Sequence, residues 1–191
     1  MDVAILLFEG FDELDAVGPF EVFNSVDGAS ATLVTLEEAA EVTASHGLRV
    51  GVDATLDAVD PDVLLVPGGG WRDRSRPGVW TEYERGAIPE AVAARHEAGT
   101  PVASVCTGGM LLAKAGILDG RPATTHHTAL DDLRETGADV REERVVDDGD
   151  VVTCGGVTAG IDLALHVIER EFGPDTADAA ARRMEYERRS V

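Results

Sequence analysis

The sequence predicts a three-layer α/β domain with a mainly parallel sheet. Short apolar runs rich in valine, isoleucine and leucine alternate along the chain with segments that have helical patterns. Several of these runs are apolar at consecutive positions, as expected for strands that helices cover on both faces. The chain has 191 residues, 44% of them hydrophobic, which suits one domain spanning residues 1–191.

The strands and helices can be assigned in order along the chain. Strands are expected at residues 3–8, 31–36, 63–66, 102–105 and 151–154. Two hairpin signals join them, because residues 42–53 can turn at His46-Gly47, and residues 140–146 and 150–154 flank Asp147-Asp148-Gly149. Helices are expected at residues 19–25, 88–98, 107–115, 128–135, 161–172 and 175–187, where Pro19 suits a first turn.

Three loops should meet at one edge of the sheet. Right-handed crossovers place the carboxyl ends of parallel strands together, and α/β domains build their sites there. Residues 8–10, 67–70 and 106–108 each follow an expected strand, so we expect them to lie close together. Residues 71–78 form a polar, arginine-rich loop that is long enough to border a pocket.

Cys106 stands where an expected strand turns into an expected helix. Such a turn lifts the side chain out of the core, and the start of the helix directs unpaired N–H groups toward the thiol. That environment lowers the pKa of a cysteine and favours a nucleophilic thiolate. Gly108 and Gly109 would let a substrate approach closely. The alternative interpretation is a small buried hydrophobic residue at a strand end.

A second glycine loop, Gly68-Gly69-Gly70, follows the strand at residues 63–66. The loop lacks the spacing of phosphate and dinucleotide loops, so it is either a flexible turn or one wall of an oxyanion site. In the second case, backbone N–H groups of Gly69 or Gly70 would act together with that of Thr107. Removing one such donor typically costs about 3–4 kcal/mol of transition-state stabilisation.

Asp15 is the candidate acid. It is flanked by Leu14 and Ala16, so we expect partial burial, which would let its carboxyl group hold a proton near neutral pH. Such a group can exchange a proton with the thiol or with a substrate. Asp12 and Glu13 are interpreted as solvated acids at a helix start.

His126 is a candidate neighbour of the site, because it follows Thr124-Thr125 after an expected strand. A hydrogen-bonded structural histidine is the more ordinary interpretation. Metal-ligand spacings do not occur in the sequence, so we expect neither a metal nor another cofactor. Cys154 is interpreted as an inert strand thiol, and His46, His96 and His166 as structural or surface residues. Two cysteines do not make a disulfide framework, which fits a reducing compartment.

The chain is strongly acidic, with 36 acidic residues against 16 basic ones and a net charge of −20. Such a surface repels nucleic acid, so a nucleic-acid-binding role is disfavoured. No apolar run approaches a membrane span or a signal peptide, and we expect a cytoplasmic protein. Lys114 is the single lysine, and the acids are spread along the chain. We interpret this as adaptation to a salty cytosol, the alternative being an acidic protein of an ordinary cell.

Several motifs, taken together in order, resemble the ThiJ/PfpI superfamily, which has a class I glutamine amidotransferase-like, flavodoxin-like fold. The segments that carry the resemblance are residues 14–23, 66–69, 104–108, 115–126 and 155–162. The Leu14-Asp15 segment together with Cys106-Thr107-Gly108 is most similar to the isocyanide hydratase branch.

That resemblance implies an activity on a small molecule without a cofactor. The Cys106 thiolate would attack the terminal carbon of an isocyanide, and Asp15 would relay a proton and then help water to enter. A thioimidate intermediate would collapse to an N-substituted formamide, while Thr107 would supply a backbone N–H. The resemblance also implies a homodimer with the site near the interface.

The sequence departs from other branches of the superfamily. Peptidase-like members have histidine directly after the cysteine, where this chain has Thr107, and the His–Glu pair of the glutaminases is not evident. Peptidase and glutaminase activities are therefore disfavoured. The hydratase pattern His-Trp is here His126-His127. Two alternatives stay open: detoxification of a reactive carbonyl such as methylglyoxal, and a non-catalytic oxidative-stress sensor that uses Cys106.

Overall fold

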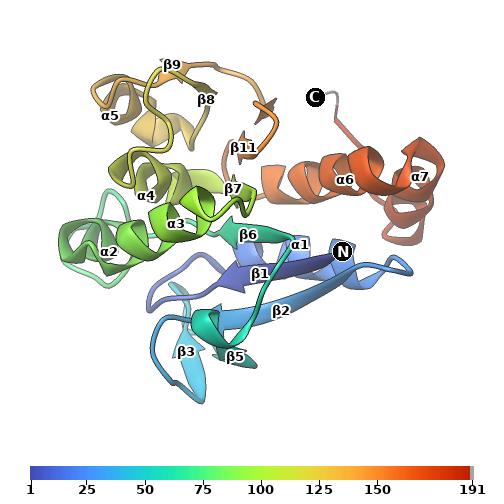
Figure 1. The fold of residues 1–191 in the computed structure, drawn as a ribbon, viewed down its shortest axis with the longest axis horizontal. Coiled ribbons are helices and arrows are strands. Elements are labelled where there is room, and N and C mark those ends of the chain that lie inside the picture. Colours follow the sequence, from blue (N-terminus) through green and yellow to red (C-terminus); the bar gives the residue numbers. More distant parts are fainter. Residues whose placement is uncertain (190–191) are drawn as a thin grey trace.

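The computed structural model describes residues 1–189 and is built around a seven-stranded sheet (Figure 1). The strand order is β10-β11-β7-β6-β1-β2-β5. All neighbours are parallel except β10 and β11, so the predicted, mainly parallel sheet is confirmed. The strands are β1 (Asp2–Leu6), β2 (Ser30–Thr35), β5 (Ala54–Thr55), β6 (Val63–Val66), β7 (Val102–Ser104), β10 (Val145–Asp147) and β11 (Val151–Cys154).

Helices flank this sheet in two groups. In one group α1, α6 and α7 pack together, and in the other α2, α3 and α4 do so (Figure 1). Their bounds are α1 (Glu13–Asn24), α2 (Val79–Arg85), α3 (Ala87–Glu97), α4 (Gly109–Lys114), α6 (Ala159–Phe172) and α7 (Pro174–Arg183). Smaller elements complete the fold: β3 (Glu41–Thr43), β4 (Arg49–Gly51), β8 (Pro122–Ala123), β9 (Asp139–Val140), α5 (Leu130–Arg134), and the short 3-10 helices η1 (Leu56–Ala58), η2 (Cys106–Gly108) and η3 (His127–Ala129).

The central strands are buried on both faces. Ile5 and Leu6 of β1, and Leu64 and Leu65 of β6, have no solvent exposure. Full burial of one such aliphatic side chain contributes about 1.5–3 kcal/mol. The consecutive apolar positions in these strands are thus explained by helices on both sides of the sheet.

The first helix is much longer than predicted. It begins at Glu13, not at residue 19, because Asp12 caps it by accepting the Leu14 N–H at 3.2 Å. Pro19 lies inside the helix and leaves one carbonyl of the preceding turn without its usual N–H donor. The helix nevertheless continues, because it packs closely on α6: a Cβ on Gly18 would lie 3.1 Å from Ile161.

Other boundaries also differ from the expected ones. The helix expected at residues 107–115 begins as the tight turn η2 before α4, and the last helix ends at Arg183, not at residue 187. Helix α2 was not expected. The hairpin at His46-Gly47 is confirmed as β3–β4, and the second hairpin pairs β10 with β11 but starts at Val145, not at residue 140.

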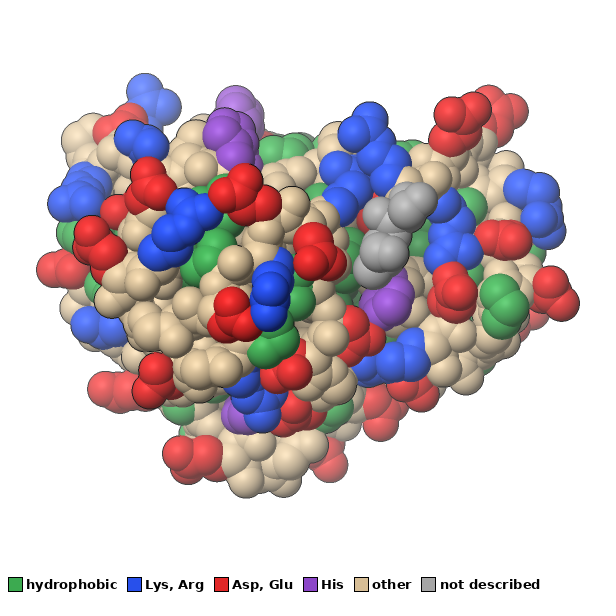
Figure 2. Space-filling model, turned by 90° about the horizontal axis from the view of Figure 1, so that it is seen from above, with side chains coloured by type: hydrophobic (Ala, Val, Ile, Leu, Met, Phe, Trp, Pro, Cys, Tyr) green, Lys and Arg blue, Asp and Glu red, His purple; other side chains and the backbone are tan. Residues whose placement is uncertain are grey.

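Charged side chains are scattered over the visible surface. Figure 2 shows acidic and arginine side chains interspersed over the face in view. Within residues 1–189, no helix has both the length and the apolar character needed to cross a bilayer.

Candidate active site

The three predicted loops meet at the carboxyl edge of the sheet. The Asp12 N–H donates to the Gly68 carbonyl at 2.8 Å, and the Gly68 N–H donates to Asp15 Oδ2 at 2.9 Å. The Gly69 N–H donates to Thr107 Oγ1 at 3.0 Å. Loops that follow β1, β6 and β7 therefore form one hydrogen-bonded unit, as the sequence predicts.

Gly68 lies at the centre of this unit. A Cβ at this position would lie 2.6 Å from the Thr107 nitrogen and 2.9 Å from Asp15 Oδ2. Both distances are shorter than a carbon atom permits. Glycine is thus required here for close approach of three chain segments.

Cys106 occupies a strained turn. Its backbone φ is +57°, a left-handed conformation that residues with a side chain seldom adopt. The surrounding structure holds it there, because its N–H donates to the Gly155 carbonyl at 3.0 Å and its carbonyl accepts from Thr125 Oγ1 at 2.8 Å. The residue is 6% exposed. This is the geometry of a nucleophile elbow, where strain held by neighbours presents a side chain at a site.

Two backbone N–H groups face the thiol. Those of Thr107 and Val157 lie close enough to the Cys106 side chain to lower the pKa of its thiol. Val157 itself has a φ of +47°, so a second strained residue delivers its amide to the sulfur. Donors in these positions stabilise negative charge that develops on sulfur or on a bound substrate.

Asp15 lies in the first turn of α1 and is fully buried. Its Oδ2 accepts the Gly68 N–H, while its Oδ1 has no hydrogen-bond partner among the described residues. Burial, and after it the charge of Asp12, raise the pKa of Asp15 to about 8 against the lowering effect of Gly68 and Cys106. The expectation of a carboxyl group that holds a proton near neutral pH thus agrees with its surroundings.

The pKa of the Cys106 thiol is raised, not lowered as the elbow alone predicts. Burial is the largest cause and the Asp15 charge is the next, and together they outweigh the N–H groups of Thr107 and Val157. Burial therefore favours the neutral form of both groups, the thiol and the carboxylic acid. Each perturbs the pKa of the other, so the thiol and the carboxyl group form a coupled pair between which a proton can be exchanged.

Gly69 and Gly70 hold the glycine loop in shape. Their φ angles are +119° and +69°, and the Gly69 carbonyl accepts the Val79 N–H at 2.7 Å. The Gly69 N–H is engaged by the Thr107 hydroxyl, so in this structure it positions Thr107 and does not face the sulfur. The donors at the sulfur are those of Thr107 and Val157, and an oxyanion role for Gly70 stays a prediction.

His126 packs behind the turn that contains Val157. Its Nδ1 lies 2.8 Å from Thr128 Oγ1, and a Cβ on Gly156 would lie 2.1 Å from the imidazole ring. Burial lowers the pKa of His126, and the neighbouring His127 lowers it further, which favours the neutral ring. The structure therefore places His126 against the Gly156-Val157 turn, where it supports one of the two donors.

Val157 is the site residue that sequence reasoning missed. The signal that could have found it is Gly155-Gly156, which follows β11 just as Gly68-Gly69-Gly70 follows β6. Since β11 pairs with β7 in parallel, the loops after both strands must emerge at the same edge.

The remaining candidate side chains have structural partners. Cys154 is fully buried on β11, and burial raises its pKa. His96 and His166 contact Asp150 and Asp147 at 2.8 and 2.7 Å. Within residues 1–189, one cluster could offer three ligand atoms to a metal, namely Asp12, Glu13 and His46, but the Glu13 carboxylate already bonds to His46 and Ser45.

Cys106 lies at a strained strand-to-helix turn above a parallel sheet, near the buried carboxyl group of Asp15. These features define an α/β protein of the nucleophile-elbow class. The model of the DJ-1/PfpI family matches residues 1–170. The chain therefore belongs to the DJ-1/PfpI family, and the resemblance predicted from its motifs is confirmed.

Relatives of known name extend the comparison. The chain is 36% identical over 187 residues to an isonitrile hydratase of Pseudomonas putida, covering 97% of this chain and 78% of that protein. It is 34% identical over 156 residues to a deglycase of Thermococcus kodakarensis, covering 80% of this chain and 89% of that protein. A ThiJ/PfpI family protein of Pseudomonas syringae has a similar structure, with a TM-score of 0.88, 31% identity, and coverage of 99% of this chain and 76% of that one.

Proposed function

We propose that this protein is a cysteine-dependent hydratase that converts an isocyanide into an N-substituted formamide. The observation that carries the proposal is the buried, mutually perturbing pair of Asp15 and Cys106 beside the Thr107 amide. An isocyanide carbon must gain both a nucleophile and a proton, and a neutral thiol next to a neutral carboxylic acid offers both. The similarity to an isonitrile hydratase supports the same reaction.

The first half of the reaction forms a covalent intermediate. The Cys106 sulfur attacks the terminal carbon, an S–C bond forms, and the carbon lone pair takes a proton from Asp15. The thiol proton passes to Asp15, so the acid is restored. The product is a thioimidate, R–N=CH–S–Cys106, which contains every atom of the thiol and the isocyanide. Thr107 and Val157 donors stabilise the charge that develops around the sulfur.

The second half consumes one water molecule. Water adds to the thioimidate carbon as a proton moves to the nitrogen, with Asp15 taking and returning protons. The C–S bond then breaks, the sulfur leaves and regains its proton, and the N-substituted formamide is released. No oxidant, reductant or metal is needed for this balance, and the cysteine ends as it began.

A second candidate, turnover of reactive carbonyls, is favoured by the similarity to a deglycase. The same thiol and carboxyl group could add to a carbonyl carbon, so the two reactions must be separated by substrate. An oxidation sensor that uses Cys106 stays an alternative, because the raised pKa of its thiol bears equally on oxidation and on nucleophilic attack.

The decisive experiment measures turnover of an aryl isocyanide and of methylglyoxal by the same preparation. We expect formamide production that Cys106→Ala abolishes and that Asp15→Asn lowers about 10²–10⁴-fold, the usual contribution of a general acid–base group. Glu21→Gln is the matched control, because it changes an exposed acid on the same helix, α1.

The hydratase proposal fails if the wild type turns over methylglyoxal but not the isocyanide, or if Cys106→Ala keeps the activity. It is supported further if mass spectrometry of a rapidly quenched reaction finds the substrate mass added to the peptide that contains Cys106.

A further inference from the structure

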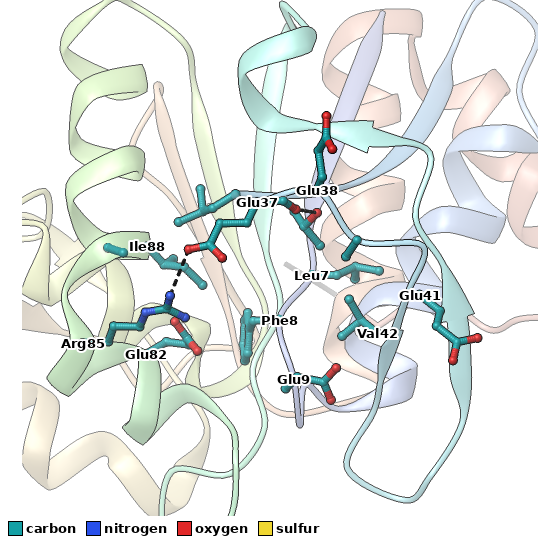
Figure 3. A pocket seen from close by; sticks show the side chains of 14 residues that line it. Leu7, Phe8, Glu9, Glu37, Glu38, Glu41, Val42, Glu82, Arg85 and Ile88 are labelled. Atoms are coloured by element: carbon teal, nitrogen blue, oxygen red, sulfur yellow. Dashed lines mark hydrogen bonds and ion pairs between the residues drawn. The ribbon is translucent and has the colours of Figure 1, made fainter.

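A cavity of about 210 Å³ lies apart from Cys106, where the ends of β1 and β2 face α2 and α3 (Figure 3). Its apolar walls include Leu7, Phe8, Val42 and Ile88, all of them buried. Pockets for drug-sized ligands measure about 300–1,000 Å³, so this one suits a smaller molecule.

Glu82 gives this cavity an unusual charge. The residue is only 9% exposed and lines the cavity from α2. Among the residues that the structure describes, its carboxyl group has no hydrogen-bond or ion-pair partner, and Figure 3 shows it beside Phe8. Burying a carboxylate without a partner is costly. Burial accordingly raises the pKa of Glu82.

Among the described residues that line the cavity, Arg85 is the cation, and it is already engaged. Arg85 bonds to Glu37 at 3.0 Å, and Figure 3 shows this pair above the Glu82 carboxyl group. Three further glutamates, Glu9, Glu38 and Glu41, border the cavity, although Figure 3 shows Glu38 and Glu41 directed away from its centre. Glu41 pairs with Arg49 and Glu37 with Arg85, so Glu82 is the buried acid of the cavity, and among the described residues it has no ion-pair partner. An incoming cation would supply one.

The apolar walls decide which kind of cation fits. A metal ion needs several ligand atoms that converge on one point, and among the described residues the carboxylates of this cavity do not converge in this way. An organic ammonium group can instead place its charge on a carboxylate while its hydrocarbon body contacts apolar side chains. The Phe8 ring adds a face that attracts a cation.

We propose that this cavity binds a small organic cation, a primary ammonium ion with a compact apolar body, through an ion pair with Glu82. The hydrocarbon part contacts Phe8, Val42 and Ile88. The site is separate from Cys106, and it does not depend on the reaction proposed above.

The test compares benzylammonium with benzyl alcohol, a neutral molecule of nearly the same shape, by calorimetry and ligand-observed NMR. We expect saturable binding of benzylammonium, and binding of the alcohol at least tenfold weaker. Glu82→Gln should weaken benzylammonium binding at least tenfold, whereas Glu84→Gln, an exposed acid on the same helix, should leave it unchanged. Arg85→Gln should tighten binding, because it removes a competing cation.

A second variant keeps the test decisive if Glu82→Gln unfolds. Ala87→Leu fills the cavity without changing any charge, and it should also block binding. Cys106→Ala should bind benzylammonium as well as the wild type does. Equal affinity for the alcohol, unchanged binding in folded Glu82→Gln or in Ala87→Leu, no binding at all, or loss of binding in Cys106→Ala would each overturn the proposal.

Discussion

At the scale of single residues, Asp15 and Cys106 are two ionisable groups that share one buried environment. Water is excluded from both, so each favours its neutral form, and this is why the pKa of Asp15 rises and that of Cys106 rises with it. The N–H groups of Thr107 and Val157 lower the pKa of Cys106, but by less than burial and the Asp15 charge raise it. In the reaction proposed above, the elbow would supply donors for a charge that forms on the sulfur or the substrate.

The shifted Asp15 pKa predicts how stability depends on pH. In the unfolded chain this carboxyl group loses its proton near pH 4, whereas in the folded protein it does so at about pH 8. Between these values the folded state binds more protons than the unfolded state. The free energy of unfolding should therefore fall as pH rises from about 4 to about 8, by at most about 1.4 kcal/mol per pH unit from this group.

Asp15→Asn removes that contribution and serves as the comparison. We expect Asp15→Asn to become more stable relative to the wild type as the pH rises from about 4 to about 8, because the variant lacks the group that destabilises the wild type over this range. Urea denaturation at closely spaced pH values measures it, with Glu21→Gln as the control for an exposed acid on α1. Parallel curves for wild type and Asp15→Asn would contradict a raised pKa.

At the scale of elements, the loops after β1, β6, β7 and β11 act as one assembly. Each turns sharply at the carboxyl edge of the sheet, and each contributes a backbone group to the site. The turn after β11 is held from behind, because the Arg144 carbonyl accepts the Gly155 N–H at 2.9 Å and Arg144 also pairs with buried Asp162 of α6. Tyr186 donates to Asp162 at 2.8 Å, so the segment after α7 is tied to the same turn.

A Gly68→Ala substitution should disrupt the assembly. Its Cβ would collide with the Thr107 nitrogen and approach Asp15, and both contacts involve atoms of the site. We expect a loss of about 1–3 kcal/mol in unfolding free energy, as is usual for overpacking, together with loss of catalysis. Denaturant unfolding and the isocyanide assay measure the two effects.

Gly51→Ala is the matched control, because nothing lies within 4 Å of its Cβ position and its φ is not positive. If Gly68→Ala behaves like Gly51→Ala in both assays, the close packing described here is wrong.

At the scale of the whole molecule, charge is the dominant feature. A net charge of −20 on 191 residues produces repulsion that opposes the compact state. Many arginines pair with exposed acids, as Arg49 does with Glu41 and Arg134 with Asp131, but exposed pairs contribute only about 0–1 kcal/mol each. The acids and arginines interspersed over the surface in Figure 2 leave most of the excess charge to be screened by salt.

The thermal midpoint should therefore rise steeply from dilute buffer to molar potassium chloride. Screening by salt shortens the range of repulsion to about 3 Å at 1 M, which stabilises a highly charged folded state. Scanning calorimetry across a salt series measures the effect, with an uncharged osmolyte at equal osmolality as the control. A flat response to salt would refute adaptation to a salty cytosol.

The sequence alone determined the fold class and the elbow, and it indicated Cys106 and Asp15 as neighbours in one candidate site, because these features depend on local patterns. Continuous apolar runs mark doubly covered strands, and a cysteine between a strand and a helix with two glycines after it marks an elbow. The acid was found in the same way, since Leu14 and Ala16 beside Asp15 indicate burial. Cytoplasmic location and a homodimer stay predictions.

Only the tertiary structure decided the protonation of the site, the second amide donor and the cavity at Glu82. A pKa depends on how completely neighbours exclude water, which no local pattern states, and burial reversed the direction expected for Cys106. Val157 reaches the sulfur only because β11 lies beside β7, and α1 runs through Pro19 only because it packs on α6. These features arise from contacts between segments that are distant in sequence, so they exist only after the chain has folded.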